Sequence, residues 1–170
     1  MNDSKRAGAS TNPSAKSDNI AVAQRAGEAM YASDLAAQNL GIVLEDIRPG
    51  YARMRMSVRA DMLNGHTTCH GGYIFVLADT AFAFSCNSYN RTTVAASAAI
   101  EFLAPAYLND VLTAVSEEQV LGAKLGIYDT VITNQDGQRI ALFRGRSYRV
   151  RGTLFPEEAP DAQSNSGSRP

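Results

Sequence analysis

One long apolar segment with helical periodicity constrains the fold of this chain more than any other feature. Residues 72–87 form a segment that is too long for a typical strand. Phe75, Ala78 and Phe82 recur within it at three- and four-residue spacing, which is typical of one face of a helix. Because apolar residues occupy much of the circumference, we expect the rest of the chain to cover this helix.

Strand-like segments lie on both sides of the helix. Before it, residues 41–58 alternate apolar and polar side chains around a Pro49-Gly50 turn, which is typical of a β-hairpin. After it come four further strand-sized segments, at 92–103, 110–121, 125–134 and 139–150. Residues 134–138 form a further turn. This order predicts an α+β fold in which an antiparallel sheet of five to six strands wraps around one long central helix.

The length of 170 residues fits a single domain. Residues 1–19 and 154–170 are rich in small and polar residues, so we expect a disordered tail at each end of a domain at 20–153. Within that domain, residues 20–31 have helical spacing. Ser33 is a candidate cap for a second short helix that stops near Gly41.

The charge and the cysteine content limit the classes of partner and the cellular compartment that we expect for this protein. Sixteen Lys and Arg against 17 Asp and Glu leave no broad cationic field for nucleic acid. Cys69 and Cys86 lie in or beside the apolar segment, as small buried hydrophobes do in a reducing compartment. Asp79 would be costly in lipid, and the first residues carry no apolar secretion signal. We therefore expect a cytoplasmic protein without a nucleic acid or membrane partner.

Asp79 is the one carboxylate inside the apolar helix. An aspartate there lowers helix propensity and costs desolvation energy unless it is paired or used in chemistry. Its position therefore favours a catalytic carboxylate. The alternative is a structural acid that is hydrogen-bonded to Thr80 or Tyr73.

The tripeptide His70-Gly71-Gly72 immediately precedes this helix. Glycines let another group approach the backbone closely, and the first N–H groups of a helix have no intrahelical partner. Free N–H groups at Gly71 and Gly72 would therefore bind a carbonyl oxygen that gains negative charge. The alternative is a glycine pair that only turns the chain.

Spacing along the helix bears on how these two features work together. Eight residues separate Gly71 from Asp79, which places them about 12 Å apart along the axis. A general base must lie within about 3 Å of its proton or one water away, so the two groups cannot serve one carbonyl from the same chain. We therefore expect an active site shared across a dimer.

The loop before the helix carries further polar residues. Asn64 and His70 can orient a water molecule or substrate by hydrogen bonding. His66, Cys69 and His70 form a single compact cluster without a distant second ligand pair, so we do not expect a metal. Sequence adjacency of Cys69 and His70 likewise does not establish a thiol nucleophile.

Phosphate-binding motifs are absent from the sequence, which has neither a Walker loop nor a GxGxxG fingerprint. Surface cations would have to meet any bound phosphate. Lys124, Arg144 and Arg146 are the candidates, and solvated strand faces are the alternative interpretation.

The stretch NGHTTCHGGYIFVLADTAFAFSCNS resembles the hotdog-fold thioesterases of the phenylacetic acid degradation family, and the resemblance runs over about residues 40–150. It implies a hotdog fold, dimers paired through their sheets and usually a homotetramer formed from two dimers. By this resemblance Asp79 acts as nucleophile or as base for water, and the Gly71 amide polarises the thioester carbonyl. Asn64 and His70 would help to position the reacting groups.

The resemblance also implies a substrate and leaves rival functions open. It points to hydrolysis of hydroxyphenylacetyl-CoA or phenylacetyl-CoA in aromatic catabolism, without a cofactor. Gly72, Tyr73, Phe75 and Thr80 are candidate substrate-binding residues beside the site, because aromatic side chains favour a hydrophobic acyl group. Ala83 stands where a sister branch carries a hydroxyl one turn after its acid, so attack by water is favoured over an acyl-enzyme. The same fold hosts dehydratases and non-catalytic acyl-CoA-binding regulatory modules.

Overall fold

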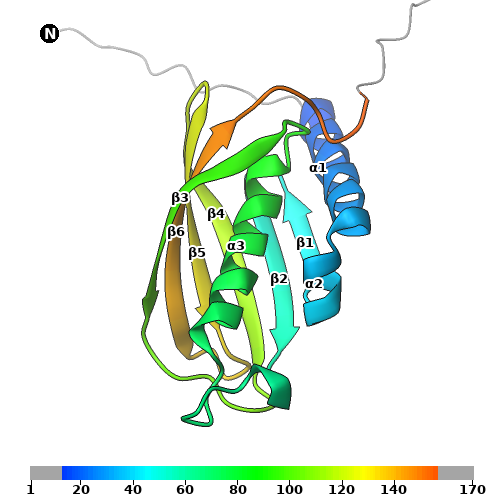
Figure 1. Ribbon diagram of the computed structural model, residues 1–170. Coiled ribbons are helices and arrows are strands. Elements are labelled where there is room, and N and C mark those ends of the chain that lie inside the picture. Colours follow the sequence, from blue (N-terminus) through cyan, green and yellow to red (C-terminus); the bar gives the residue numbers. More distant parts are fainter. Residues whose placement is uncertain (1–12, 157–170) are drawn as a thin grey trace, which may run out of the picture.

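The computed structural model describes residues 13–156, with side chains from Ser17 onward. Six strands form one antiparallel sheet, and helix α3 (Gly71–Asn87) lies against one face of it (Figure 1). Two N-terminal helices, α1 (Pro13–Ser33) and α2 (Leu35–Leu40), lie beside α3 on the same face. The expected α+β arrangement of a sheet around one long helix is confirmed.

The sheet is built from strands that follow the alternation in the sequence. The hairpin of β1 (Val43–Arg48) and β2 (Tyr51–Ser57) turns at Gly50, whose φ of 69° favours glycine. The strands after the helix are β3 (Thr93–Phe102), β4 (Val111–Leu121), β5 (Leu125–Thr133) and β6 (Arg139–Arg149). They pair in the order β1-β2-β4-β5-β6-β3, so β3 forms one end of the sheet.

The core lies between α3 and the sheet. Phe82 is buried and its ring centroid lies 5.6 Å from that of Tyr128 and 5.8 Å from that of Phe143. A Cβ atom at Gly145 of β6 would lie 2.8 Å from the Phe82 ring, so the glycine lets helix and sheet approach closely. This packing fixes the height and rotation of α3 on the sheet.

The N-terminal helices differ in detail from the expectation. Helix α1 begins at Pro13 rather than near residue 20, so residues 13–19 are helical where a tail was expected. Proline suits the first position of a helix, because its missing N–H would have no partner there. Asp34, and not Ser33, caps α2: its carboxylate accepts from the Ala37 N–H at 2.9 Å. Gly41 ends α2 as expected, with φ of 68°.

The C-terminal boundary also differs. The N–H groups of Leu154 and Phe155 donate to Oδ1 of Asn90, at 3.0 and 3.1 Å, so the folded unit continues past residue 153. The outer parts of both expected tails, residues 1–12 and 157–170, lie outside the described residues. Within the described part, none of the helices has the length and apolar character needed to cross a membrane.

The two end strands of the sheet have different surroundings. Strand β1 is covered by α1. Strand β3 pairs with β6 on one side only, and most of its side chains are exposed, including Val94 and Phe102. A ten-residue strand with an open edge and exposed apolar side chains is a surface on which another strand can pair.

Candidate active site

The start of helix α3 presents one free backbone donor and not two. His70 is the N-cap residue, and its Nδ1 accepts from the Gly72 N–H at 3.0 Å. The expectation of a free N–H at Gly72 is therefore wrong, because the cap already uses it. The Gly71 N–H donates no hydrogen bond to any described residue. Gly71 thus remains the candidate oxyanion donor, at the positive end of the α3 dipole.

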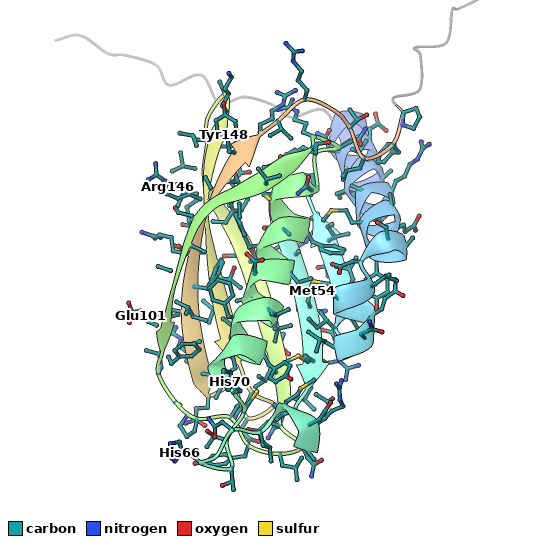
Figure 2. The ribbon with its side chains drawn as sticks, viewed as in Figure 1. Met54, His66, His70, Glu101, Arg146 and Tyr148 are labelled. Carbon is teal, nitrogen blue, oxygen red and sulfur yellow. The ribbon has the colours of Figure 1, made fainter. Side chains whose placement is uncertain are left out.

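The His70 side chain binds the protein backbone in this structure. Because Nδ1 accepts a hydrogen bond, the neutral ring carries its proton on Nε2. The His70 ring lies edge-on to Tyr73, with centroids 6.4 Å apart. Figure 2 shows His70 at the end of α3 where the helix begins. The ring is exposed, so Nε2–H can still meet a bound substrate.

Gly71 is covered by a residue that sequence reasoning missed. A Cβ atom at position 71 would lie 2.9 Å from Cζ of Phe102, at the end of β3. The exposed phenyl ring therefore rests against the backbone of the candidate donor. Strand β3 runs antiparallel to the course of α3, which is the signal that could have placed its last residue beside the first residue of the helix.

Asp79 is half-buried and has no hydrogen bond or ion pair with any described residue. Burial raises the pKa of its carboxyl above the usual range, because desolvation disfavours the charged form. The alternative of a structural acid bonded to Thr80 or Tyr73 is wrong. Thr80 donates its hydroxyl to the Val76 carbonyl at 2.7 Å instead.

Gly71, Phe75 and Asp79 occupy successive i, i+4 positions of α3, so they share one side of the helix. Phe75 packs edge-on against Phe143 of β6, with ring centroids 5.5 Å apart. This side of α3 therefore faces the β6 and β3 end of the sheet. Asp79 stands two turns beyond Gly71, about 12 Å along the axis. The structure keeps the two groups apart within one protomer.

Asn64 organises the loop that leads into the helix. Its Oδ1 accepts from the His66 N–H at 2.8 Å, and its Nδ2 donates to the Thr68 hydroxyl at 3.0 Å. The loop is tied down where the Cys69 N–H donates to the Ala106 carbonyl at 2.8 Å. Asn64 thus shapes the approach to His70, and its side-chain amide is largely used within the loop.

The thiol in this loop is poorly suited to nucleophilic chemistry. Burial raises the pKa of Cys69 to about 11, so the group stays a neutral thiol near pH 7. Among residues 17–156, no three His, Cys, Asp or Glu side chains are grouped as metal ligands.

A groove of about 480 Å³ opens beside the start of α3. His70, Gly72 and Tyr73 line it. The remaining lining residues are Leu40, Asp61, Leu63 and Val76. The groove is mainly apolar with a few polar groups, but Gly71, Asp79 and Phe102 do not line it.

The candidate phosphate-binding cations lie elsewhere. Arg144 makes a bidentate ion pair with Asp129, at 2.6 and 2.7 Å, so its guanidinium already has a partner. Lys124 lies in the β4–β5 hairpin and is exposed. Figure 2 shows Arg146 toward the other end of the molecule from His70. Within one protomer the structure does not bring these cations to the start of α3.

Comparison with known proteins shows the family of this chain. A model of the Thioesterase superfamily matches residues 66–141. The chain is 46% identical over 129 residues to the acyl-coenzyme A thioesterase PaaI of Escherichia coli strain K12, covering 76% of this chain and 92% of that protein.

Solved structures show the same relationship. The structure of the E. coli PaaI protein from the phenylacetic acid degradation operon matches with a TM-score of 0.78 and 45% identity, over 79% of this chain and 97% of that one. A hypothetical thioesterase of Streptococcus pneumoniae TIGR4, solved with coenzyme A, matches with a TM-score of 0.63 and 28% identity, over 66% and 90% of the two chains. The chain therefore belongs to the hotdog-fold Thioesterase superfamily and is a thioester hydrolase of the acyl-CoA thioesterase family that includes PaaI.

Proposed function

We propose that this enzyme hydrolyses aryl-acetyl-CoA thioesters, of the hydroxyphenylacetyl-CoA or phenylacetyl-CoA type, to the free acid and coenzyme A. The observation that carries the proposal is the half-buried Asp79 without a hydrogen bond or ion pair, on the same side of α3 as the free N–H of Gly71. The E. coli relative from the phenylacetic acid degradation operon supports the substrate class. The relative solved with coenzyme A supports the carrier.

In the proposed mechanism, Asp79 takes a proton from a water molecule as the water oxygen attacks the thioester carbonyl carbon. The carbonyl oxygen becomes an oxyanion, which accepts a hydrogen bond from the backbone N–H of Gly71 of the partner subunit. The C–S bond then breaks, and the coenzyme A thiolate leaves and takes up a proton. A thioester suits this site, because its thiolate leaves readily and one carboxylate and one N–H suffice.

Pairing of two protomers through the open edge of β3 is part of the proposal. Asp79 and Gly71 lie about 12 Å apart along one helix, so one carbonyl can meet both groups only if they come from two chains. Strand β3 contacts α3, and Phe102 at its end lies beside Gly71. Pairing there would bring the two active-site halves to one interface.

A panel of acyl-CoAs assayed for free thiol release tests the substrate class. We expect wild-type protein to cleave aryl-acetyl-CoAs faster than straight-chain acyl-CoAs. Asp79→Asn and Asp79→Ala should lower kcat by about 100-fold or more without unfolding, because the general base is lost. Full activity in both variants would refute the role of Asp79. Turnover of crotonyl-type substrates without thiol release would indicate a dehydratase instead.

Subunit exchange tests the shared site. Asp79→Asn and Gly71→Val are each inactive in this mechanism, but a mixed dimer retains one intact site. After complete random exchange, about one quarter of the wild-type activity should return, because half the dimers are mixed and each holds one of two sites. Mixtures that exchange subunits, as shown by mass spectrometry, and yet stay inactive would contradict the shared site.

A further inference from the structure

We propose that Phe102 is a specificity-determining residue of this enzyme: its ring shields the Gly71 N–H from water and forms an aromatic wall against which the acyl group lies. The inference rests on the proposed function and adds a residue that the Asp79 and Gly71 chemistry does not include. It also gives a reason why glycine suits position 71.

The contact between Phe102 and Gly71 is close. A Cβ atom at position 71 would lie 2.9 Å from Cζ of the ring, 3.2 Å from Cε1 and 3.5 Å from Cε2. A contact of 2.9 Å is closer than real Cβ atoms approach, so any larger residue at 71 must displace the ring or the helix. The glycine therefore makes room for the ring at the backbone that carries the oxyanion donor.

The backbone around Phe102 is held in place, so the ring has a defined position. Phe102 pairs with Ala141 of β6 in the sheet register. The next N–H, at Leu103, donates to the Ile140 carbonyl at 2.8 Å. Further along, the Ala106 carbonyl accepts from the Cys69 N–H at 2.8 Å, directly before His70. The end of β3 is thus tied both to β6 and to the loop that starts α3.

The exposure of the ring indicates more than core packing. Phe102 is 53% exposed, whereas Phe82 and Phe84 of α3 are almost fully buried. An exposed phenyl ring beside an unpaired N–H lowers the water content around that donor, which strengthens a hydrogen bond to a developing oxyanion. An aromatic acyl group gains ring–ring contact there that a short aliphatic acyl group does not.

Substrate preference separates this role from simple packing. Phe102→Ala should lower kcat/KM for phenylacetyl-CoA by about 10-fold, the size of one favourable aromatic pair, and for butyryl-CoA by less than about 3-fold. Phe102→Tyr should keep the preference, because it keeps the ring. Leu103→Ala is the matched control, since Leu103 is the adjacent residue and is 52% exposed. Equal losses on both substrates, in step with a lower Tm, would show that Phe102 only packs.

A double substitution tests the contact itself. Gly71→Ala places a methyl group against the ring and should lower kcat by about 100-fold, as expected when an oxyanion donor is displaced. Adding Phe102→Ala removes the obstruction, so the double variant should be about 10-fold more active than Gly71→Ala alone. A double variant no more active than Gly71→Ala would refute the coupling.

The two proposals fail in different ways. If wild type and Leu103→Ala release no thiol from any acyl-CoA, the proposed function falls and the role of Phe102 falls with it. If both are active and Phe102→Ala matches them in rate and substrate preference, only the role of Phe102 is refuted.

Discussion

At the residue scale, the proposed role of Asp79 in chemistry carries a cost to folding. A half-buried carboxylate without a hydrogen bond or ion pair is solvated less well in the folded chain than in the unfolded one. The same desolvation raises its pKa, which makes the carboxylate a better proton acceptor than an exposed aspartate. Loss of hydration and gain of basicity therefore have one cause.

Replacement of Asp79 by its neutral isostere should stabilise the protein. Because the pKa of Asp79 is raised in the folded state, its contribution to stability is full at low pH and is lost as pH rises through that pKa. Asp79→Asn should therefore have a higher Tm than wild type at pH 7, and the difference should shrink as pH falls through the folded-state pKa. Calorimetry across pH measures this. Asp136→Asn, in the exposed β5–β6 turn, is the control and should not show the trend.

His70 is predicted to stabilise the helix start through its side chain. His70→Ala removes the acceptor for the Gly72 N–H and should lower the free energy of unfolding by about 1 kcal/mol, the usual cost of losing an N-cap. His70→Asn can restore the acceptor and should recover most of that loss. Urea unfolding of the three proteins checks this. Equal stability of wild type and His70→Ala would mean that the cap does not contribute to the free energy of unfolding.

At the scale of elements, the position of α3 on the sheet decides where the side that carries Gly71 and Asp79 faces. Gly145 of β6 allows the Phe82 ring to lie directly on the strand, and Phe75 packs on Phe143 one turn away from Asp79. Aromatic rings on the same side of α3 as the candidate residues Gly71 and Asp79 thus hold the helix on the strand. A shift of this contact would move Asp79 relative to the sheet edge.

The contact between Gly145 and the Phe82 ring can be tested by adding one methyl group. Gly145→Ala would place a Cβ atom 2.8 Å from the Phe82 ring and should destabilise the fold by about 1–3 kcal/mol, as overpacking does. Gly65→Ala is the matched control, because nothing lies within 4 Å of its added Cβ. Chemical denaturation measures both. If Gly145→Ala is as stable as wild type, the interface between α3 and β6 accommodates the methyl group without loss of stability.

At the scale of the whole molecule, the sheet leaves one end strand open beside the candidate site. The outer edge of β3 carries unpaired backbone groups along its length, and at the other end of the sheet α1 packs against β1. Pairing of β3 with a second copy would satisfy those groups and cover Val94 at the same time. Assembly and activity are therefore expected to depend on one surface.

A charge placed on β3 should separate the protomers and reduce activity together. Ser97 lies opposite Arg146 within the sheet, so Ser97→Asp gains an ion pair inside the protomer. A β3–β3 pair centred near Ser97 would set two aspartates against each other. We expect a smaller mass by light scattering and a kcat/KM lowered by about 10-fold or more, because monomers lack a complete site. Gln119→Asp on β4 is the control, and an active Ser97→Asp monomer would overturn the shared-site model.

Local pattern was sufficient to predict the elements of this fold. The spacing of Phe75 and Phe82 predicted α3, and the Pro49-Gly50 turn predicted the first hairpin. Short-range periodicity carries this information, because a helix and a strand each bury one side at a fixed repeat. The early start of α1 at Pro13 was missed, since its first turn is polar and only the proline marks it.

The sequence by itself determined the elements, the acid in the apolar helix and the glycine at its start. Only the tertiary structure decided the contacts of these groups: His70 accepts from the Gly72 N–H, Asp129 binds Arg144, and Phe102 packs against Gly71. Each of these outcomes depends on the three-dimensional direction of a side chain, and two of them join residues far apart in the chain. The apolar periodicity of the sequence predicts which side of an element is buried, whereas contacts between elements depend on how the elements pack.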